Sequence, residues 1–278
     1  MWSTSSKLNS ACNLASNRQP IGIFDSGIGG LTAAYAIIQQ LPREQIVYFG
    51  DTARLPYGPQ PAEIVRRYST EITAFLLRQG CKAIVVACNT ATAAALHHLR
   101  EQWPDVPFIG MEPAVKPGAR ATRSGKVGVL ATDGTFKSQR YASLMHRYAK
   151  DVELLENPCT GLVPRIERGL LSGPDTEAFL RGILEPMLHA GADTFVLGCT
   201  HYPFVQPLIE KIVGPAATVI NPAPAIARQL QRVLEERQLL SPELPGAHRF
   251  YVSGEKGNFE VLASELLGME MRVESECL

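Results

Sequence analysis

Two cysteines stand where the chemistry of this chain would be expected. Cys88 and Cys199 end two similar apolar runs, at residues 83–87 and 194–198, and polar side chains follow each of them. Runs rich in Val, Ile and Leu are typical of strands buried in parallel sheets, which bind ligands just past the carboxyl ends of their strands. Each thiol is therefore predicted to lie beside a small-ligand site, and the two thiols are expected to face each other.

Proton transfer at one carbon atom is the chemistry that uses both thiols. Inverting a carbon centre needs a base that removes a proton from one face and an acid that returns a proton to the other. Two identical groups can run this reaction in both directions when one is thiolate and the other is thiol. Because free cysteine has a pKa of about 8.5, neighbouring groups must tune it. The candidates for this tuning are Asp25, Glu167 and His201.

Each of these residues also has an ordinary structural interpretation. A buried cysteine often acts only as a small hydrophobic residue, and Asp25 can form a turn before glycine. Spacing alone favours Glu167 as a solvated surface charge, while His201 can cap or pack against a helix. Zinc held by the two cysteines and His201 is disfavoured, because zinc sites often use close pairs and no Cys-x-x-Cys pair is present. A single nucleophilic thiol with His201 as its base would leave the second cysteine unexplained.

Small polar groups around the two cysteines predict a pocket for a ligand that carries carboxylates. The glycine-rich turn at 25–30 and the starts of the predicted helices can present backbone N–H groups to such a ligand. Each of the candidate anchors could equally be a helix N-cap or part of a turn. These anchors are Ser26, Tyr57, Gly58, Asn89, Thr90 and Thr200.

Short apolar runs alternate with helical patterns along the chain, which predicts an α/β protein with parallel-type sheets. The pattern restarts near residue 126, about as far beyond residue 21 as the second cysteine lies beyond the first. Two related α/β halves are therefore expected. Strands are predicted at 21–24, 46–49, 83–87, 108–111, 126–131, 152–156, 194–198, 218–220 and 249–252. Helices are predicted at 31–41, 63–79, 91–103, 162–171, 176–189, 204–213, 223–240 and 258–267.

The composition disfavours several classes of protein. The chain has 278 residues, of which 45% are hydrophobic and 19% charged, as in ordinary soluble proteins. Its 27 basic and 27 acidic residues give no support for direct nucleic-acid binding. Membrane insertion is not expected, because no apolar run approaches the roughly 18–20 residues that a spanning helix needs. A cytoplasmic protein with reduced cysteines is expected, with residues 1–20 as a flexible extension.

Several motifs in a fixed order resemble those of bacterial glutamate racemases. They are Phe-Asp-Ser-Gly-Ile-Gly-Gly at 24–30, Gly-Asp-Thr at 50–52, Pro-Tyr-Gly at 56–58, Ala-Cys-Asn-Thr-Ala-Thr at 87–92 and Gly-Cys-Thr-His-Tyr-Pro at 198–203. The resemblance implies an enzyme without cofactor or metal that interconverts L- and D-glutamate. It also implies that the product, D-glutamate, supplies peptidoglycan synthesis.

The resemblance further implies a role for each candidate residue. Cys88 would take the proton from D-glutamate and Cys199 the proton from L-glutamate, with Asp25, Glu167 and His201 assisting them. The implied substrate contacts are Asp25, Ser26, Tyr57, Gly58, Asn89, Thr90, Thr200 and His201. The implied fold has two α/β domains related by a pseudo-two-fold axis, with the active site in the cleft between them. The domains are expected to span 21–113 plus 222–278, and 114–221.

Some alternatives and partners stay open at this point. Aspartate could replace glutamate as substrate, because related racemases share the two-cysteine design. A non-catalytic role in binding a protein such as DNA gyrase would not depend on the thiols, and a thiol hydrolase would release product rather than invert it. A homodimer is expected, and a peptidoglycan precursor is a possible activator.

Overall fold

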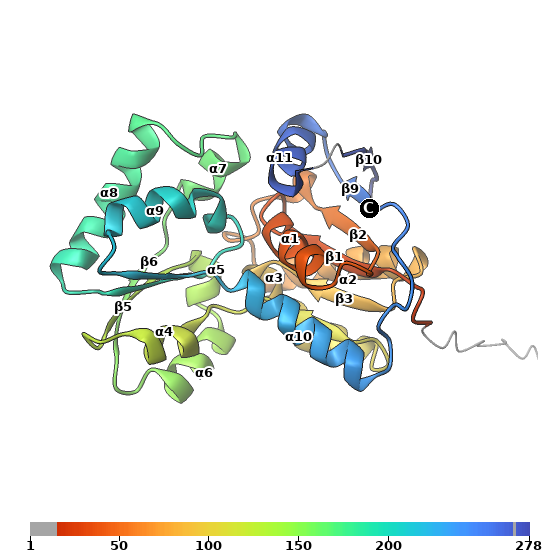
Figure 1. Cartoon of the computed structure of the whole chain (residues 1–278), viewed down its shortest axis with the longest axis horizontal. Helices are drawn as coiled ribbons and strands as arrows, with labels where there is room; N and C mark the ends of the chain where they lie inside the picture. The colour runs from red at the N-terminus through yellow and green to blue at the C-terminus, as the bar shows by residue number, and fades with distance from the viewer. Residues whose placement is uncertain (1–15, 269–270) are drawn as a thin grey trace, which may run out of the picture.

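The computed structural model describes residues 16–268 and 271–278, which form two parallel sheets with helices on both faces (Figure 1). Most of the predicted extension, residues 1–15, lies outside the described residues. Residues 16–20 lie against the first sheet, where the Nζ of Lys82 donates a hydrogen bond of 2.7 Å to the carbonyl of Asn17. The flexibility of the extension stays a prediction.

The larger sheet has six strands in the order β10-β9-β2-β1-β3-β4, and all of its strand pairs are parallel. The strands are β1 (Ile21–Asp25), β2 (Ile46–Gly50), β3 (Ala83–Val86), β4 (Phe108–Gly110), β9 (Arg249–Val252) and β10 (Val273–Ser275). The flanking helices are α1 (Leu31–Gln40), α2 (Ala62–Arg78), α3 (Asn89–Gln102), α10 (Ala223–Glu236) and α11 (Gly257–Leu267), with a short 3₁₀ helix η1 (Thr52–Arg54) after β2.

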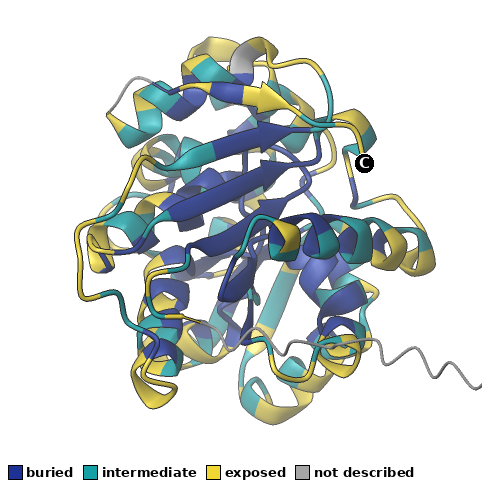
Figure 2. Cartoon of the chain, turned by 90° about the vertical axis from the view of Figure 1, so that its right-hand side faces the viewer, coloured by how far each residue is buried: buried dark blue, intermediate teal, exposed yellow. Residues whose placement is uncertain are grey.

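Alternation along the central strands explains why helices cover both faces of this sheet. Side chains of a strand point alternately to opposite faces, and both sets are apolar here. Ala83 and Val85 pack in the same cluster as residues of α1 and α10, whereas Ile84 and Val86 pack with residues of α2 and α3. Figure 2 shows the central strands buried throughout, while the helices around them expose their outer sides.

The smaller sheet has four parallel strands in the order β6-β5-β7-β8. The strands are β5 (Lys126–Leu130), β6 (Glu153–Asn157), β7 (Thr194–Leu197) and β8 (Thr218–Ile220). The helices are α4 (Val115–Ala121), α5 (Asp133–Phe136), α6 (Gln139–Tyr148), α7 (Leu162–Glu167), α8 (Pro174–His189) and α9 (Gln206–Val213), with the 3₁₀ helix η2 (Tyr202–Val205) before α9.

The two sheets share one strand order, which confirms the predicted pair of similar α/β halves. In the larger sheet β1 lies between β2 and β3, with β4 beyond β3; in the smaller sheet β5 lies between β6 and β7, with β8 beyond β7. In each half, the cysteine follows the strand that pairs with the first strand on the same side, which is β3 beside β1 and β7 beside β5. The larger sheet gains β9 and β10 because the chain returns to it after the second half (Figure 1). The predicted domain boundaries agree with this division but remain a proposal.

Several elements differ from the prediction. Helices α4, α5 and α6 and the last strand β10 were not predicted, and α7 and α10 end earlier than expected. Helix α6 contributes little to the core, since Tyr141 is its one residue classed as buried. Helix α3 begins at Asn89 rather than at residue 91, so Cys88 becomes its N-cap. This shift places the first cysteine directly at a helix start.

Candidate active site

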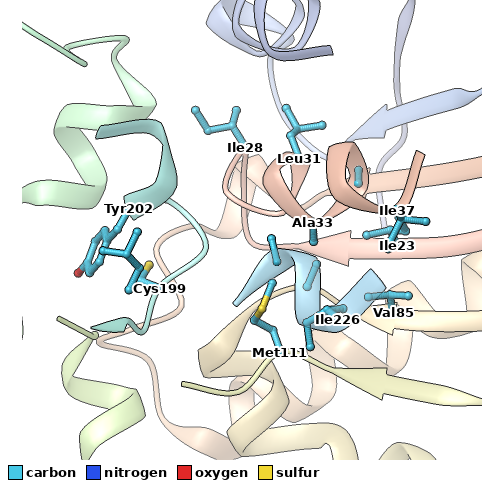
Figure 3. Packing of buried hydrophobic residues seen from close by; sticks show 14 of the residues in the cluster. Ile23, Ile28, Leu31, Ala33, Ile37, Val85, Met111, Cys199, Tyr202 and Ile226 are labelled. Carbon is cyan, nitrogen blue, oxygen red and sulfur yellow. The ribbon is translucent and has the colours of Figure 1, made fainter. Parts of the chain in front are cut away.

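Both cysteines lie just past the carboxyl ends of their strands, as predicted. Cys88 follows β3, and its Sγ accepts a hydrogen bond of 3.4 Å from the backbone N–H of Ala91 in the first turn of α3. Cys199 follows β7 and lies across from Ile28 of the first half, as Figure 3 shows. The two side chains are buried but line one pocket of about 260 Å³. Two thiols from similar halves therefore meet at a common cavity.

Most of the predicted site residues line the same pocket. They are Ser26, Tyr57, Gly58, Asn89, Thr90, Thr200 and His201, together with the two cysteines. Asp25 and Glu167 are not among the lining residues; each contacts residues that are. Asn89 is buried, and among the described residues neither oxygen nor nitrogen of its side-chain amide has a hydrogen-bond partner. That amide is free to bind a ligand in the pocket.

Asp25 is fully buried beneath the glycine-rich turn. Its Oδ2 accepts hydrogen bonds from the N–H groups of Gly27 at 3.1 Å and Gly30 at 3.0 Å, so the turn interpretation is also correct. Its Oδ1 accepts a hydrogen bond of 3.4 Å from the hydroxyl of Thr200 in the other half. Burial raises the pKa of Asp25, and the charge of His201 and the two N–H groups oppose that rise.

Glu167, His201 and Cys199 form a connected chain. The Nε2 of His201 lies 2.6 Å from the Oε1 of Glu167, and its Nδ1 lies 3.7 Å from the Sγ of Cys199. The side chain of Glu167 is only 15% exposed, so its interpretation as a solvated surface charge is wrong. Burial alone would lower the pKa of His201, but hydrogen bonds to Cys199 and Glu167 raise it well above its usual value. A positive charge is thereby held beside the second thiol.

The environment of Cys88 has the opposite electrostatic character. Burial is the main cause that raises the pKa of its thiol, and the nearby carboxylate of Asp25 raises it further. The N–H of Ala91 and the hydroxyl of Ser26 oppose this rise. Because desolvation and a negative neighbour both disfavour an anionic sulfur, the protonated thiol is the favoured form of Cys88.

Close packing of the glycine-rich turn holds the two halves together near Cys199. The N–H of Ile28 donates a hydrogen bond of 3.1 Å to the same Oε1 of Glu167 that contacts His201. A Cβ at Gly29 would lie 2.5 Å from the Nδ1 of His201, closer than real Cβ contacts allow. Glycine is therefore required where this turn meets the histidine.

A second contact between the halves lies beside Gly58. The hydroxyls of Thr90 and Thr132 are 3.0 Å apart, and a Cβ at Gly134 would lie 2.7 Å from the carbonyl oxygen of Gly58. The neighbouring side chain of Tyr57 is anchored from below, because its hydroxyl donates a hydrogen bond to the buried carboxylate of Asp51. This loop therefore closes one side of the pocket.

Some pocket residues were missed by sequence reasoning. Thr132, Cys159 and Tyr202 line the cavity but were not predicted as site residues, although Tyr202 lies within the motif at 198–203. Thr132 follows the first strand of its half as Ser26 follows β1, so the internal repeat was a signal that could have found it. Cys159 has a positive φ of 47°, and burial raises the pKa of its thiol to about 12.

Residues 16–268 and 271–278 contain no group of three or more His, Cys, Asp or Glu side chains that could hold a metal ion. Over the same residues, every helix is too short or too polar to cross a membrane.

Comparisons with known proteins agree on one family. Residues 32–230 match the family model described as Asp/Glu/Hydantoin racemase. A glutamate racemase of Pseudomonas paraeruginosa is 49% identical over 260 residues, which cover 94% of this chain and 98% of that protein.

Solved structures are similar over nearly the whole chain. The structure of glutamate racemase isoform RacE1 from Bacillus anthracis has a TM-score of 0.84 and 36% identity, covering 94% of this chain and 98% of that one. The Escherichia coli glutamate racemase, in complex with L-glutamate and the activator UDP-MurNAc-ala, has a TM-score of 0.79 and 30% identity, covering 93% and 98%.

Proposed function

Because this chain belongs to the Asp/Glu/Hydantoin racemase family, we propose that it interconverts L- and D-glutamate by proton transfer between two thiols. The observation that carries this proposal is the meeting of Cys88 and Cys199, from similar halves, at one pocket. An acid and a base on opposite sides of one carbon atom are what inversion requires. The D-glutamate that is formed would supply peptidoglycan synthesis.

The proposed reaction moves protons only between Cα and the two sulfur atoms. Starting from L-glutamate, the thiolate of Cys199 removes the Cα proton, so the C–H bond breaks and an S–H bond forms. The thiol of Cys88 then gives its proton to the opposite face of the carbanion, which yields D-glutamate and leaves Cys88 as thiolate. The reverse reaction restores the starting state. Every proton is accounted for in this scheme.

Three charged residues support this exchange in the proposal. The positive charge on His201, held by Glu167, lies beside the sulfur of Cys199, which is the base for L-glutamate in this proposal. Asp25 accepts hydrogen bonds from the glycine-rich turn and from the hydroxyl of Thr200, so it holds that turn against the residue that follows Cys199. Its charge also keeps the proton on Cys88, ready for donation.

Neutral donors would hold the substrate. The side chains of Ser26, Asn89, Thr90 and Thr200 and the backbone of the Tyr57–Gly58 loop surround the cavity. The amide of Asn89 supports this role most directly, because it is buried and has no partner among the described residues. An unpaired buried amide is costly, and a bound carboxylate would relieve that cost. The named relatives favour glutamate over aspartate.

A peptidoglycan precursor is proposed as an activator of this enzyme. The Escherichia coli relative was solved with the activator UDP-MurNAc-ala, which carries a diphosphate. A hollow of about 490 Å³ in this chain is lined by Arg100, Lys116, Arg140 and Arg147, and such cations bind phosphate groups well. The Nε of Arg140 is buried without a partner among the described residues. Adding UDP-MurNAc-ala should raise the activity, and Arg147→Gln should weaken this response.

A homodimer and a cytoplasmic location complete the proposal. Tyr35 on α1 and Val261 on α11 are large apolar side chains that stay exposed, and a second copy could cover them. The two working cysteines must stay reduced, which a cytoplasmic compartment ensures. Light scattering of the protein, compared with a Tyr35→Glu/Val261→Glu variant, tests the dimer. A wild-type protein that is monomeric at all concentrations would contradict it.

Incubation with L-glutamate in heavy water, without pyridoxal phosphate, is the test of the activity itself. Circular dichroism should decay to zero, and deuterium should appear at Cα of the inverted product. Cys88→Ser and Cys199→Ser should each abolish the decay. Aspartate is tested in parallel. Inversion of aspartate but not of glutamate would show that aspartate is the substrate. Inversion of neither acid, with the activator present, would sink the racemase proposal and favour the non-catalytic protein-binding role.

A further inference from the structure

The catalytic pocket has His201 as its one cationic side chain among the described lining residues, and that charge is paired with Glu167. Glutamate carries a net negative charge, and the proposed reaction needs a thiolate beside it. Among the described residues that line the pocket, none is lysine or arginine. A cationic surface outside the pocket would raise the local concentration of an anionic substrate.

A second, wider hollow adjoins the pocket and has such cations. This entrance groove, of about 670 Å³, shares Gly58, Pro59, Thr90 and Asp133 with the pocket. Its outer walls come from α2, α3, α5 and the start of α6. Arg66 and Lys137 line it, and Asp133 is the one acid among its described lining residues. The groove therefore carries a net positive charge.

The two cations of the entrance groove are available to a ligand. Both side chains are exposed, and neither forms an ion pair with any residue in the described part of the chain. The Nε of Arg66 donates a hydrogen bond of 3.4 Å to the carbonyl of Ala94, which holds the guanidinium near the start of α3. Its neighbour Arg67, by contrast, pairs with Glu71 at 3.9 Å.

The wall between the groove and the pocket is a contact between the two halves. It consists of the Thr90–Thr132 hydroxyl pair and the approach of Gly134 to the carbonyl of Gly58. Separation of the halves at this contact would open the groove into the pocket. A substrate in the groove would then have a direct path to the pocket that the two thiols line.

We propose that the entrance groove is the site where acidic amino acids first bind, with Arg66 and Lys137 attracting their carboxylates. The proposal rests on the racemase function proposed above. Since the two cations lie outside the pocket, they act on substrate capture and not on proton transfer. Their contribution is therefore expected in KM, with kcat unchanged, and it should weaken as salt screens the charges.

The test compares Arg66→Gln/Lys137→Gln with the control Arg67→Gln/Lys150→Gln, which changes the same residue types and the same net charge. Steady-state kcat and KM for L-glutamate are measured from about 10 mM salt, where the Debye length is about 30 Å, to about 1 M, where it is about 3 Å. At low salt the KM of the groove variant should rise about fourfold, because a unit charge about 10 Å away changes affinity roughly twofold in water. The difference should vanish at high salt.

The control separates a local effect from the overall charge of the protein. A KM for the control that matches the wild type, beside a raised and salt-sensitive KM for the groove variant, supports the entrance groove. Equal KM values for the groove variant and the wild type at low salt overturn it, as does an equal rise in the control. A wild-type protein that fails to racemise glutamate contradicts the proposed function instead, so the two failures are distinguishable.

Discussion

The two cysteines occupy equivalent places in two similar halves, yet their surroundings differ. Cys88 caps a helix of fourteen residues beside the carboxylate of Asp25, whereas Cys199 lies beside a histidine that is paired with Glu167. A negative neighbour disfavours an anionic sulfur and a positive neighbour favours it. The halves share a backbone topology, but their titratable side chains make the two thiols unequal.

This difference suggests how a symmetric reaction starts from an asymmetric site. We infer that Cys88 carries its proton at rest, because burial and the carboxylate of Asp25 raise the pKa of its thiol. Each conversion of L- to D-glutamate leaves the proton on Cys199 instead of Cys88, and the reverse conversion restores the starting state. The charges of Asp25 and His201 would then bring the free enzyme back to the same state whichever enantiomer leaves.

Removing either thiol should give the largest loss of activity and should separate the roles of the two cysteines. Cys88→Ala and Cys199→Ala should each lose inversion by about 10³-fold or more, in the range of general acid–base contributions. Cys88→Ala should still exchange the Cα proton of L-glutamate with heavy water, and Cys199→Ala that of D-glutamate, as followed by proton NMR. Exchange of both enantiomers by both variants would contradict the assignment of one thiol to each face.

A methyl group at Gly29 should give the next largest loss of activity, because it disturbs only the surroundings of Cys199. Its Cβ would meet the Nδ1 of His201 at 2.5 Å and displace the histidine from the sulfur. We expect kcat to fall by about 10²-fold in Gly29→Ala, as for a misplaced catalytic group. Gly182→Ala is the matched control, since a Cβ there has no neighbour within 4 Å. Equal activity of the two variants would show that the turn does not position His201.

Glu167→Gln should have a smaller effect that depends on pH. The amide retains an oxygen for the N–H of Ile28 but no longer supports the positive charge of His201, so the pKa of that histidine should fall. The wild type keeps the charge as pH rises through the usual histidine range, whereas the variant loses it. The kcat/KM ratio of wild type to variant should therefore grow to about tenfold between roughly pH 6 and 8. A constant ratio over that range would contradict this role.

Alkylation should reveal the smallest difference between the two thiols. Iodoacetamide should modify Cys88 in Cys199→Ser more slowly at neutral pH than it modifies Cys199 in Cys88→Ser, because burial and the carboxylate of Asp25 disfavour the reactive thiolate of Cys88. The modification of Cys88 should accelerate as pH rises, since burial raises the pKa of its thiol. Peptide mass spectrometry distinguishes these sites from the other cysteines. Equal rates at neutral pH would remove the inferred resting asymmetry.

The sequence predicts best what depends on residues close together in the chain. The strand before each cysteine, and the polar residues after it, could be recognised because they form single short runs. The repeated strand order was likewise implied by the repeated pattern. The pairing of Glu167 with Ile28 joins positions that lie 139 residues apart, and no local pattern reports such a contact.

Several of the missed elements have few buried residues. Strand β10 has three residues, and the short helix α5 has one residue classed as buried, so their patterns could not reveal them. Cys159 reaches the pocket through a backbone turn with positive φ, which a cysteine rarely adopts. Such positions are fixed by the packing of the complete fold, and single-sequence patterns do not record that packing.

The return of the chain to the larger sheet has a consequence for biosynthesis. The smaller half is one continuous stretch, so it can fold on the ribosome as soon as it has emerged. The first half cannot be finished then, because β2 remains an unpaired edge until β9 is made. The buried Asp51 that anchors Tyr57 also receives a hydrogen bond of 2.6 Å from Ser253, just after β9. The described residues that line the pocket are all made by Tyr202, but the hydrogen bonds that hold Asp51 beneath Tyr57 are complete only after Ser253 is made.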